Sequence, residues 1–406
     1  MLKRLFDAND WPFLLPLPPW SDPTDRAVRR IRMSARTALR HRDLARRGRL
    51  AVGCAAATWP LLALVKAWRD TRGPRRLHPG RLAAVADAWW LQLGHNLRLA
   101  DVEGLRLDLP DRRRRVRRFV TDAENKYLLE TINRGLPSAA LSDKRHFADF
   151  CAHHHLPAPP LLARSNGQPT TAEHLRDWPD SDLFLKPANA WGGNDIHLLR
   201  RDPDAPVWRT GTGEPVSPVT IGAVAHRLLH GAAWLLQPRL RNGPEFADFA
   251  AGPEAALATV RVVTGRIVPG GPVEIVAGFM RFPLRGSIVD NLCAGGIGAD
   301  YDPATGILQV ARHLQGSATL YTHHPDTGAA IAGRRIPRWE EIGDLARRAH
   351  APVADIATLG WDIALTPAGP TLIETNPNWG VLLDTPLGDT AYLRILSQPA
   401  LQGRLP

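Results

Sequence analysis

The sequence predicts a mixed fold of helices and strands, either α/β or α+β, with two or three lobes. The chain has 406 residues, which is long for one domain. Hydrophobic residues make up 44% of it and charged residues 22%, as is ordinary for a core-forming protein. From about residue 120 onward, short apolar stretches typical of strands, such as 182–187, 233–236 and 362–366, alternate with helical stretches such as 338–359.

Positive charge is concentrated in residues 1–120. They hold 26 Lys and Arg against 11 Asp and Glu, a balance of +15, whereas residues 121–406 hold 25 against 29, a balance of −4. The first segment is therefore predicted to be a separate basic module, mostly helical.

Helical spacing over residues 24–50 predicts one long helix in this module, capped by Thr24 and ended by Gly48. Its arginines recur every three or four positions and so line one face: Arg29, Arg32, Arg36 and Arg40. Either they pair with acidic residues elsewhere, or they form a surface for the phosphates of an anionic membrane or a nucleic acid.

The segment Ala51–Trp68 comes close to the length and hydrophobicity of a membrane span. It has only 18 residues and carries Pro60 and Lys66, whereas a span needs about 20 predominantly apolar residues. We expect a buried helix pair here, with an anchor on a membrane surface as the alternative.

The cysteines and the first residues of the chain indicate the cellular compartment of the protein. The three cysteines, Cys54, Cys151 and Cys293, are far apart and odd in number, which excludes a disulfide framework or a cysteine zinc site. Asp7 and Asp10 interrupt the apolar run that a signal peptide needs. We therefore expect a cytoplasmic protein, with peripheral membrane attachment as an open addition.

The stretch WDIALTPAGPTLIETNPNWG carries three residues with oxygen ligands on two predicted strands. Glu374 and Asn376 share a face, because side chains alternate across a strand. A turn over residues 366–370 would place Asp362 opposite Glu374, whereas a turn one residue shorter would move it away. Magnesium prefers hard oxygen ligands, so we favour the first register and a metal site. The alternative is a hairpin with surface acids.

A lysine ends an apolar strand in the segment FLKPANAWGGND. Lys186 can point into a cleft and neutralise phosphate charge, and Gly192-Gly193 let backbone N–H groups approach phosphates closely. The alternative is an ordinary glycine turn. The segment is not a P-loop, because the pattern GxxxxGK[ST] occurs nowhere in the chain.

Two further segments are weak motifs alone and gain meaning only together with the two segments described above. Asp143-Lys144 stands at the head of a predicted helix, 42 residues before Lys186. The apolar strand in WLLQPRLRNGPEF runs into residues 237–240, where backbone groups can face an adenine edge.

Taken in order, these four segments resemble the ATP-grasp superfamily from about Leu141 to the C-terminus. In detail the chain is similar to the branch described as sugar-transfer-associated ATP-grasp, or alpha-L-glutamate-ligase-like, proteins. This likeness rests on ATVRVVT (258–264), GFMRFP (278–283), VDNLCAGGIGADYDPATG (289–306), HPDTG (324–328) and GWDIALTPAGPTLIETNPNWG (360–380). It implies an α+β fold of two lobes with ATP between them: a first lobe over 121–236 with a glycine-rich lid, and a second over 237–406 with the metal site.

The resemblance also implies roles for single residues. The positions that match ATP contacts, from the phosphates to the adenine and ribose, are Lys144, Lys186, Gly192, Gly193, Gln237, Pro238, Leu240 and Glu245. Those that match magnesium ligands are Asp362, Glu374 and Asn376.

One position departs from the pattern of many ligases of the superfamily, which carry an arginine two residues before the first metal carboxylate. This chain has Gly360 there. The positive charge near the reacting acyl group must then come from elsewhere. We predict that Arg281 supplies it, with Arg261 as the second candidate, and the alternative for each is a structural ion pair.

The function implied is an ATP- and Mg2+-dependent ligase, in polysaccharide or natural-product biosynthesis. A carboxylate would attack the γ-phosphate of ATP to give an acyl-phosphate and ADP, and an amine would then displace the phosphate to form an amide. The alternatives are a phosphotransferase acting on a hydroxyl, and a membrane- or nucleic-acid-associated binding module with a residual nucleotide site. The expected partners are a small or carrier-bound carboxylate and amine, with an anionic membrane or RNA for residues 1–120.

Overall fold

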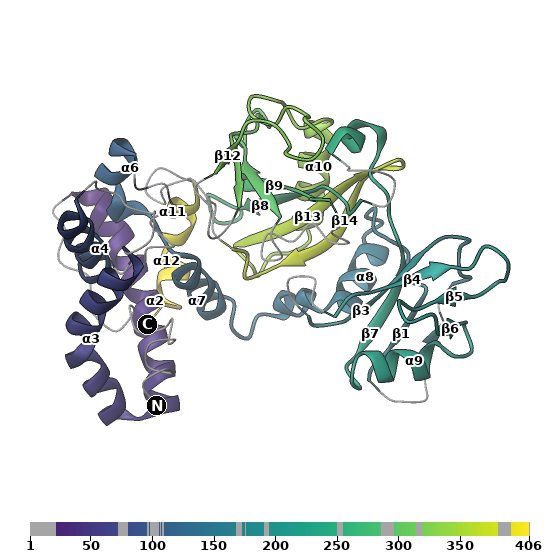
Figure 1. Cartoon of the computed structure of the whole chain (residues 1–406), viewed down its shortest axis with the longest axis horizontal. Coiled ribbons are helices and arrows are strands. Elements are labelled where there is room, and N and C mark those ends of the chain that lie inside the picture. The colour runs from purple at the N-terminus through teal and green to yellow at the C-terminus, as the bar shows by residue number, and fades with distance from the viewer. Residues whose placement is uncertain are drawn as a thin grey trace.

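The computed structural model describes residues 22–71, 80–95, 97, 105, 107, 109–167, 173–174, 176–190, 195–249, 255–285, 296–313, 319–380 and 391–405. In these ranges the chain forms a group of helices at one end and two β-sheets with helices packed on them (Figure 1). All the strand pairs described in the two sheets are antiparallel, so the fold is α+β, as the resemblance implies.

The first sheet has the strand order β2-β1-β7-β3-β4-β5-β6. The helix α9 (Ile221–Leu228) covers one face of it, and Ile221, Val224 and Ala225 share a core with Leu183 and Leu185. We call this sheet with α9 the first lobe. Its strands are β1 (Ala163–Ser165), β2 (Glu173–His174), β3 (Leu183–Pro187), β4 (His197–Arg201), β5 (Trp208–Arg209), β6 (Pro215–Val216) and β7 (Trp234–Pro238).

The second sheet has the strand order β12-β11-β10-β9-β8-β13-β14. Its strands are β8 (Thr259–Gly265), β9 (Glu274–Phe282), β10 (Ile297–Asp300), β11 (Ala311–His313), β12 (Leu320–Tyr321), β13 (Thr358–Thr366) and β14 (Gly369–Asn376). The helix α10 (Trp339–His350) packs on one face, and we call the two together the second lobe. The predicted helix over 338–359 is too long: the helix ends at His350, and Pro352 just after it has no backbone N–H to continue the helical hydrogen bonds.

Between the two lobes lies α8 (Lys144–His153), which Figure 1 shows between the sheets. Phe147 and Cys151 are buried in the core of the second lobe, whereas Ala148 packs against Leu235 of the first. The helix therefore joins the two lobes. The short helices η3 (Pro137–Ser142) and η4 (Pro244–Phe249) lie beside the second sheet, near β14 and β13 respectively.

The first described helix, α2 (Pro23–Arg47), begins and ends close to the predicted bounds. Asp22 caps it by accepting a hydrogen bond from the N–H of Asp25 at 2.9 Å, so the predicted cap at Thr24 is wrong. Pro23 suits the first helical position, which already places Thr24 inside the helix. The helix ends at Gly48, whose φ of 81° favours glycine.

Two of the four arginines predicted on one face of α2 are buried. Arg32 and Arg36 pair with Glu124 of α7 (Asp122–Ile132), at 2.9 and 3.0 Å, and the three side chains are at most 2% exposed. Arg40 is exposed. For Arg32 and Arg36, the interpretation as internal ion pairs is therefore correct, and the interpretation as a phosphate surface is wrong.

A hydrophobic core also joins α2 to the second lobe. Val28, Ile31 and Ala35 are buried there against α7, the second sheet and α11 (Ala391–Leu396), which α12 (Pro399–Gln402) follows. The other buried members are Val120, Leu128, Leu129, Ile132, Val263, Val276, Ala277, Trp379, Tyr392, Ile395 and Leu396.

The remaining N-terminal helices are α3 (Arg49–Asp70) and α4 (Arg81–His95), with the short α6 (Pro110–Arg114) and η2 (Val116–Arg118) after them. The segment predicted as a buried helix pair is one helix, α3, which continues through Pro60. The prediction of burial is right for one side of the helix, with Val52, Trp59 and Ala63, and wrong for the other, because α3 packs on α4 and α2 with only part of its surface. Among the described helices, none combines the length and the hydropathy needed to cross a membrane.

Candidate active site

Four of the charged residues predicted for the site lie on one face of the second sheet: Arg261, Arg281, Asp362 and Glu374. Val260, Val262 and Ile363 are buried in the core beneath α10. Their sequence neighbours Arg261 and Asp362, which pair in register across β8 and β13, therefore project from the opposite face. On this second face Glu374 lies near Lys144 of α8, and Val263 of β8 joins the core around α2.

The hairpin of β13 and β14 brings Asp362 opposite Glu374, although not through the predicted turn. Its loop has only two residues, 367–368. A regular ladder from that loop would pair Asp362 with Ile373. A β-bulge next to Asp362 shifts the register by one residue and puts Glu374 in that place.

Two arginines hold Asp362, which is 1% exposed. Arg261 pairs with both of its carboxylate oxygens, with Nη2 2.8 Å from Oδ2. Arg281 of β9 places Nη2 2.6 Å from the same oxygen, while its Nε donates to the hydroxyl of Thr259 at 2.9 Å. Burial alone would raise the pKa of Asp362, but the two guanidinium groups hold that pKa well below its ordinary value.

The absence of a side chain at Gly360 matters for Arg261. A Cβ there would lie 2.8 Å from the Cβ of Trp379 and 3.2 Å from the Cδ of Arg261. An arginine at position 360 would have no room in this arrangement. The neighbouring strand β8 instead carries Arg261 to the carboxylate of Asp362.

Glu374 is the more open of the two carboxylates, with 30% of its side chain exposed. Its Oε2 lies 3.8 Å from Nζ of Lys144, and its Oε1 accepts a hydrogen bond from Nδ2 of Asn376 at 3.3 Å. Burial and the neighbouring carboxylate of Asp362 raise the pKa of Glu374. The structure thus brings together residues 230 positions apart in the sequence.

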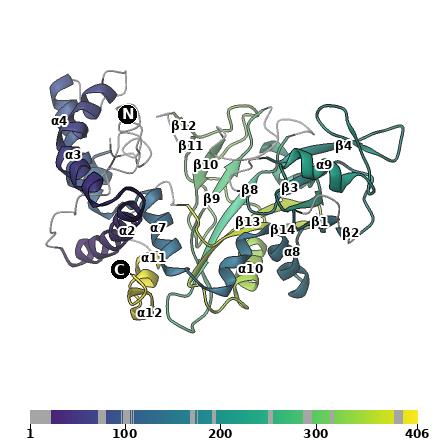
Figure 2. The ribbon, with the colours of Figure 1, turned by 90° about the horizontal axis from the view of Figure 1, so that it is seen from below.

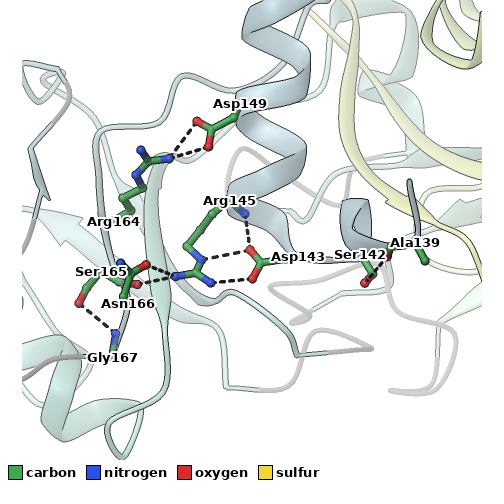
Figure 3. Close-up of polar contacts among 9 residues, drawn as sticks. All are labelled: Ala139, Ser142, Asp143, Arg145, Asp149, Arg164, Ser165, Asn166 and Gly167. Atoms are coloured by element: carbon green, nitrogen blue, oxygen red, sulfur yellow. Dashed lines mark hydrogen bonds and ion pairs between the residues drawn. The ribbon is translucent and has the colours of Figure 1, made fainter. Parts of the chain in front are cut away.

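The start of α8 fixes the position of Lys144. Asp143 caps the helix, and its carboxylate accepts hydrogen bonds from the backbone N–H and the guanidinium of Arg145 (Figure 3). Arg145 also donates to the carbonyl of Ser165 and the side chain of Asn166, just after β1. This network ties the first turn of α8 to the first lobe.

Lys144 itself contacts the segment that follows β3. Its backbone N–H donates to the carbonyl of Ala188 at 3.0 Å, and Nζ donates to the carbonyl of Ala190 at 2.7 Å. Gly192 and Gly193, predicted to form the phosphate loop, come directly after this segment and lie outside the described residues.

Lys186 on β3 and Gln237 on β7 face each other across neighbouring strands. Nζ of Lys186 donates to Oε1 of Gln237 at 3.2 Å, and Nε2 of Gln237 donates to the carbonyl of Pro159 at 3.4 Å. Burial lowers the pKa of Lys186 to about 8, and the positive charge of Lys144 contributes to the shift. Lys186 stands two residues before Ala188, whose carbonyl accepts the backbone hydrogen bond of Lys144.

The predicted adenine and ribose residues lie along the exit from β7. Pro238 ends that strand, Leu240 follows it, and both are half-buried. Glu245 stands further on, in η4, and its carboxylate is 4.0 Å from Nη1 of Arg338. The backbone N–H of Gly243 donates to Leu365 at 2.7 Å, which fastens this segment to β13.

Two charged residues on the same sheet face were missed from the sequence. Asp300 and Arg312 are 5% and 3% exposed, and Gly298 pairs in register with both Arg281 and Arg312. Arg312 therefore lies two strands from Arg281. Gly298 stands between them on β10 and has no side chain to separate the two arginines. A usable signal was the placement of single charges inside the apolar stretches IGADY and VARH, since buried charges need partners.

The residue types fit one divalent cation at Glu374 and Asn376, provided that the Asn376 amide, whose Nδ2 now donates to Glu374, turns its oxygen toward the ion. Asp362 fits less well, because both of its oxygens already contact arginines. Within the described ranges there is no cluster of three or more His, Cys, Asp or Glu residues suited to a metal ion.

This geometry agrees with the comparison against protein families. The sequence matches the family described as sugar-transfer associated ATP-grasp over residues 123–395, about two thirds of the chain. The chain belongs to the sugar-transfer-associated ATP-grasp family. Membership places this ATP-grasp protein among ATP-dependent enzymes.

Two of the solved structures that this ATP-grasp protein resembles are distant in sequence. The crystal structure of D-cycloserine synthetase DcsG matches with 13% identity over 66% of this chain and 71% of that chain, with a TM-score of 0.32. The biotin carboxylase domain of 2-oxoglutarate carboxylase from Hydrogenobacter thermophilus, solved with MgADP, ADP and bicarbonate, matches with 13% identity and a TM-score of 0.30. The match covers 63% of this chain and 45% of the carboxylase chain. No curated protein matches the sequence significantly.

Proposed function

We propose that this ATP-grasp protein is a ligase that joins a carboxylate to an amine with the conversion of ATP to ADP. The observation that carries the proposal is the contact between α8 and the second lobe: Nζ of Lys144 lies 3.8 Å from the carboxylate of Glu374, while its backbone N–H bonds to Ala188, two residues after Lys186. Two cations and a solvent-accessible acid are the groups needed to hold a nucleotide triphosphate and its metal ion.

In this proposal each group has a separate task. Lys144 and Lys186 bind the phosphates, and Glu374 with Asn376 holds a magnesium ion, which would neutralise phosphate charge as the phosphoryl group is transferred. Gln237 orients Lys186 through its hydrogen bond.

The arginines act on the acyl side of the proposed reaction. Arg261 and Arg281 lie on neighbouring strands and converge on Asp362, so their guanidinium groups are held rigidly. A fixed positive charge stabilises an anionic transition state without reorganisation during the reaction. Asp362 then acts by positioning these arginines.

The test is ADP release by the purified full chain with Mg-ATP and pooled carboxylic acids, amino acids and sugar acids, with and without hydroxylamine. The proposal predicts ADP only when an acid is present, together with a hydroxamate trapped from the acyl-phosphate. ADP without hydroxamate, accompanied by a phosphorylated alcohol, would replace the ligase with a phosphotransferase. Failure to bind ATP at all would overturn both.

A further inference from the structure

Helix α3 presents an apolar stripe to solvent. Its large side chains Leu50, Leu61, Leu64, Val65 and Trp68 are 83, 66, 38, 45 and 38% exposed. Gly53, Cys54 and Ala57 are exposed between them at helical spacing, so the stripe follows one face. From Leu50 to Trp68 it is about 27 Å long at the usual helical rise of about 1.5 Å per residue. The sequence has no charged residue between Arg49 and Lys66.

A helix that is apolar on all sides ordinarily lies inside a core or in contact with lipid. The inner side of α3, with Val52, Trp59 and Ala63, has such a core against the neighbouring helices. The stripe faces away from it, and both views show α3 at the outer edge of the helical group, far from the two sheets (Figures 1 and 2). An apolar helix face that is exposed at the edge of a protein suits contact along a membrane surface.

Cationic side chains border the stripe at both ends. Arg49 is exposed beside Leu50, and the guanidinium of Arg81 stacks on the ring of Trp68, with its central carbon 4.0 Å from the ring centroid. A groove of about 280 Å³ opens between α2 and α3, next to the stripe. It is lined by two arginines and four apolar or small residues: Arg40, Leu44, Arg49, Val52, Gly53 and Ala56.

We propose that the α3 stripe docks on a membrane of anionic phospholipids, with Arg40 and Arg49 at the phosphates and Leu61, Leu64 and Trp68 among the acyl chains. At a lipid surface the anionic phosphates lie outside the acyl chains. Apolar side chains with arginines at their border match this order. A second copy of this face would fit badly, because two-fold packing would bring two modules of balance +15 together. The proposal goes beyond the proposed reaction and does not depend on it.

The experiment is flotation of the full chain with vesicles of phosphatidylcholine alone and of phosphatidylcholine containing phosphatidylglycerol. We expect at least tenfold stronger binding to the anionic vesicles and a steep loss of binding with added salt. Leu61→Glu with Leu64→Glu should lower the binding at least tenfold. Arg40→Ser with Arg49→Ser should remove the preference for anionic lipid.

The matched control is Val219→Glu with Val268→Glu, at two valines that are 93 and 58% exposed on the ATP-grasp lobes. It should bind vesicles as the unchanged chain does. All variants replace exposed residues, so an unchanged melting temperature and circular dichroism spectrum would show that they are folded.

Three results would overturn the proposal. The unchanged chain could fail to bind either vesicle, or Leu61→Glu with Leu64→Glu could bind as well as the control. The third is a dimer in light scattering that the same double variant dissolves, without vesicle binding, because the stripe would then belong to a second copy.

Discussion

Glu374 is the residue on which the proposed metal site most depends. Replacing it by glutamine keeps the size of the side chain but removes the negative charge that faces Lys144. We expect turnover to fall roughly 100-fold or more, because metal-assisted charge neutralisation is worth several kcal/mol. The melting temperature should stay close to that of the unchanged chain, since the side chain is 30% exposed. Full activity in Glu374→Gln would remove the metal assignment.

Asp362 should behave differently from Glu374. Asp362→Asn removes the negative charge that faces the guanidinium groups of Arg261 and Arg281. We therefore expect slow turnover and a lower melting temperature. Manganese binding in the presence of a non-hydrolysable ATP analogue, followed by electron paramagnetic resonance, should be retained. Loss of manganese binding equal to that in Glu374→Gln would make Asp362 a ligand rather than a positioning residue.

Lys186 gives the site a dependence on pH. Its pKa is lowered to about 8 by burial and by Lys144, and bound phosphates would raise it again. ATP affinity should therefore be flat below about pH 8 and fall by up to about tenfold per pH unit above it, because the free protein then loses the proton that binding requires. Lys186→Arg should flatten the profile in an equilibrium titration. A flat profile for the unchanged chain would contradict this.

The sequence predicts the candidate site residues by type and order, whereas their contacts come only from the structure. Residue type and order predicted Lys144, Lys186 and Glu374, and the structure brings these three together. The pairing of Asp362 with Glu374 depends on a β-bulge, which no local sequence pattern predicts. Arg312 was overlooked because its neighbour in the site, Arg281, is close only through the register of β10 between them.

At the scale of elements, one buried cluster joins α2 to α7. Burial alone would raise the pKa of Glu124, but Arg32 and Arg36 hold it below its ordinary value. The stability from this pairing is therefore present above the pKa of the unfolded chain and is lost as the pH falls through the folded value.

Glu124→Gln should accordingly lower the free energy of unfolding by roughly 3–5 kcal/mol near neutral pH, because it leaves two arginines buried without their counter-charge. Glu340→Gln is the matched control, since its ion pair with Arg335 is exposed and should contribute little. Urea unfolding followed by circular dichroism measures both. Equal effects would show that the cluster does not hold α2 in place.

Local sequence signals predict the ends of α2 more reliably than they predict which of its side chains are buried. Pro23 and Gly48 mark the ends of α2, as proline and glycine often do. Spacing could not separate the buried Arg32 from the exposed Arg40, because both lie on the predicted face and burial depends on the position of Glu124 in α7. The outer side of α3 was wrongly expected to be buried for the same reason.

For the whole molecule, the basic module and the ATP-grasp body share a core. The family match begins at residue 123, yet Val28, Ile31 and Ala35 of α2 are buried beside Val263 of β8. Composition marked the first 120 residues as distinct, and the packing ties at least α2 to the second lobe. A charge balance describes the surface of a segment, whereas its independence as a folding unit depends on buried apolar contacts.

A fragment of residues 121–406 tests this connection. Removal of α2 would expose the apolar side of α7 and α11 and leave Glu124 buried without its arginines. We therefore expect the fragment to aggregate or to melt at least 10 °C below the full chain, with about 4–8 °C lost per kcal/mol in a small domain and less in a larger one. Differential scanning calorimetry should show α2 and the second lobe melting in one transition, and adding back residues 1–120 as a separate chain should restore part of the loss. A fragment that is monomeric, melts like the full chain and binds ATP equally well would instead make the basic module a separable domain.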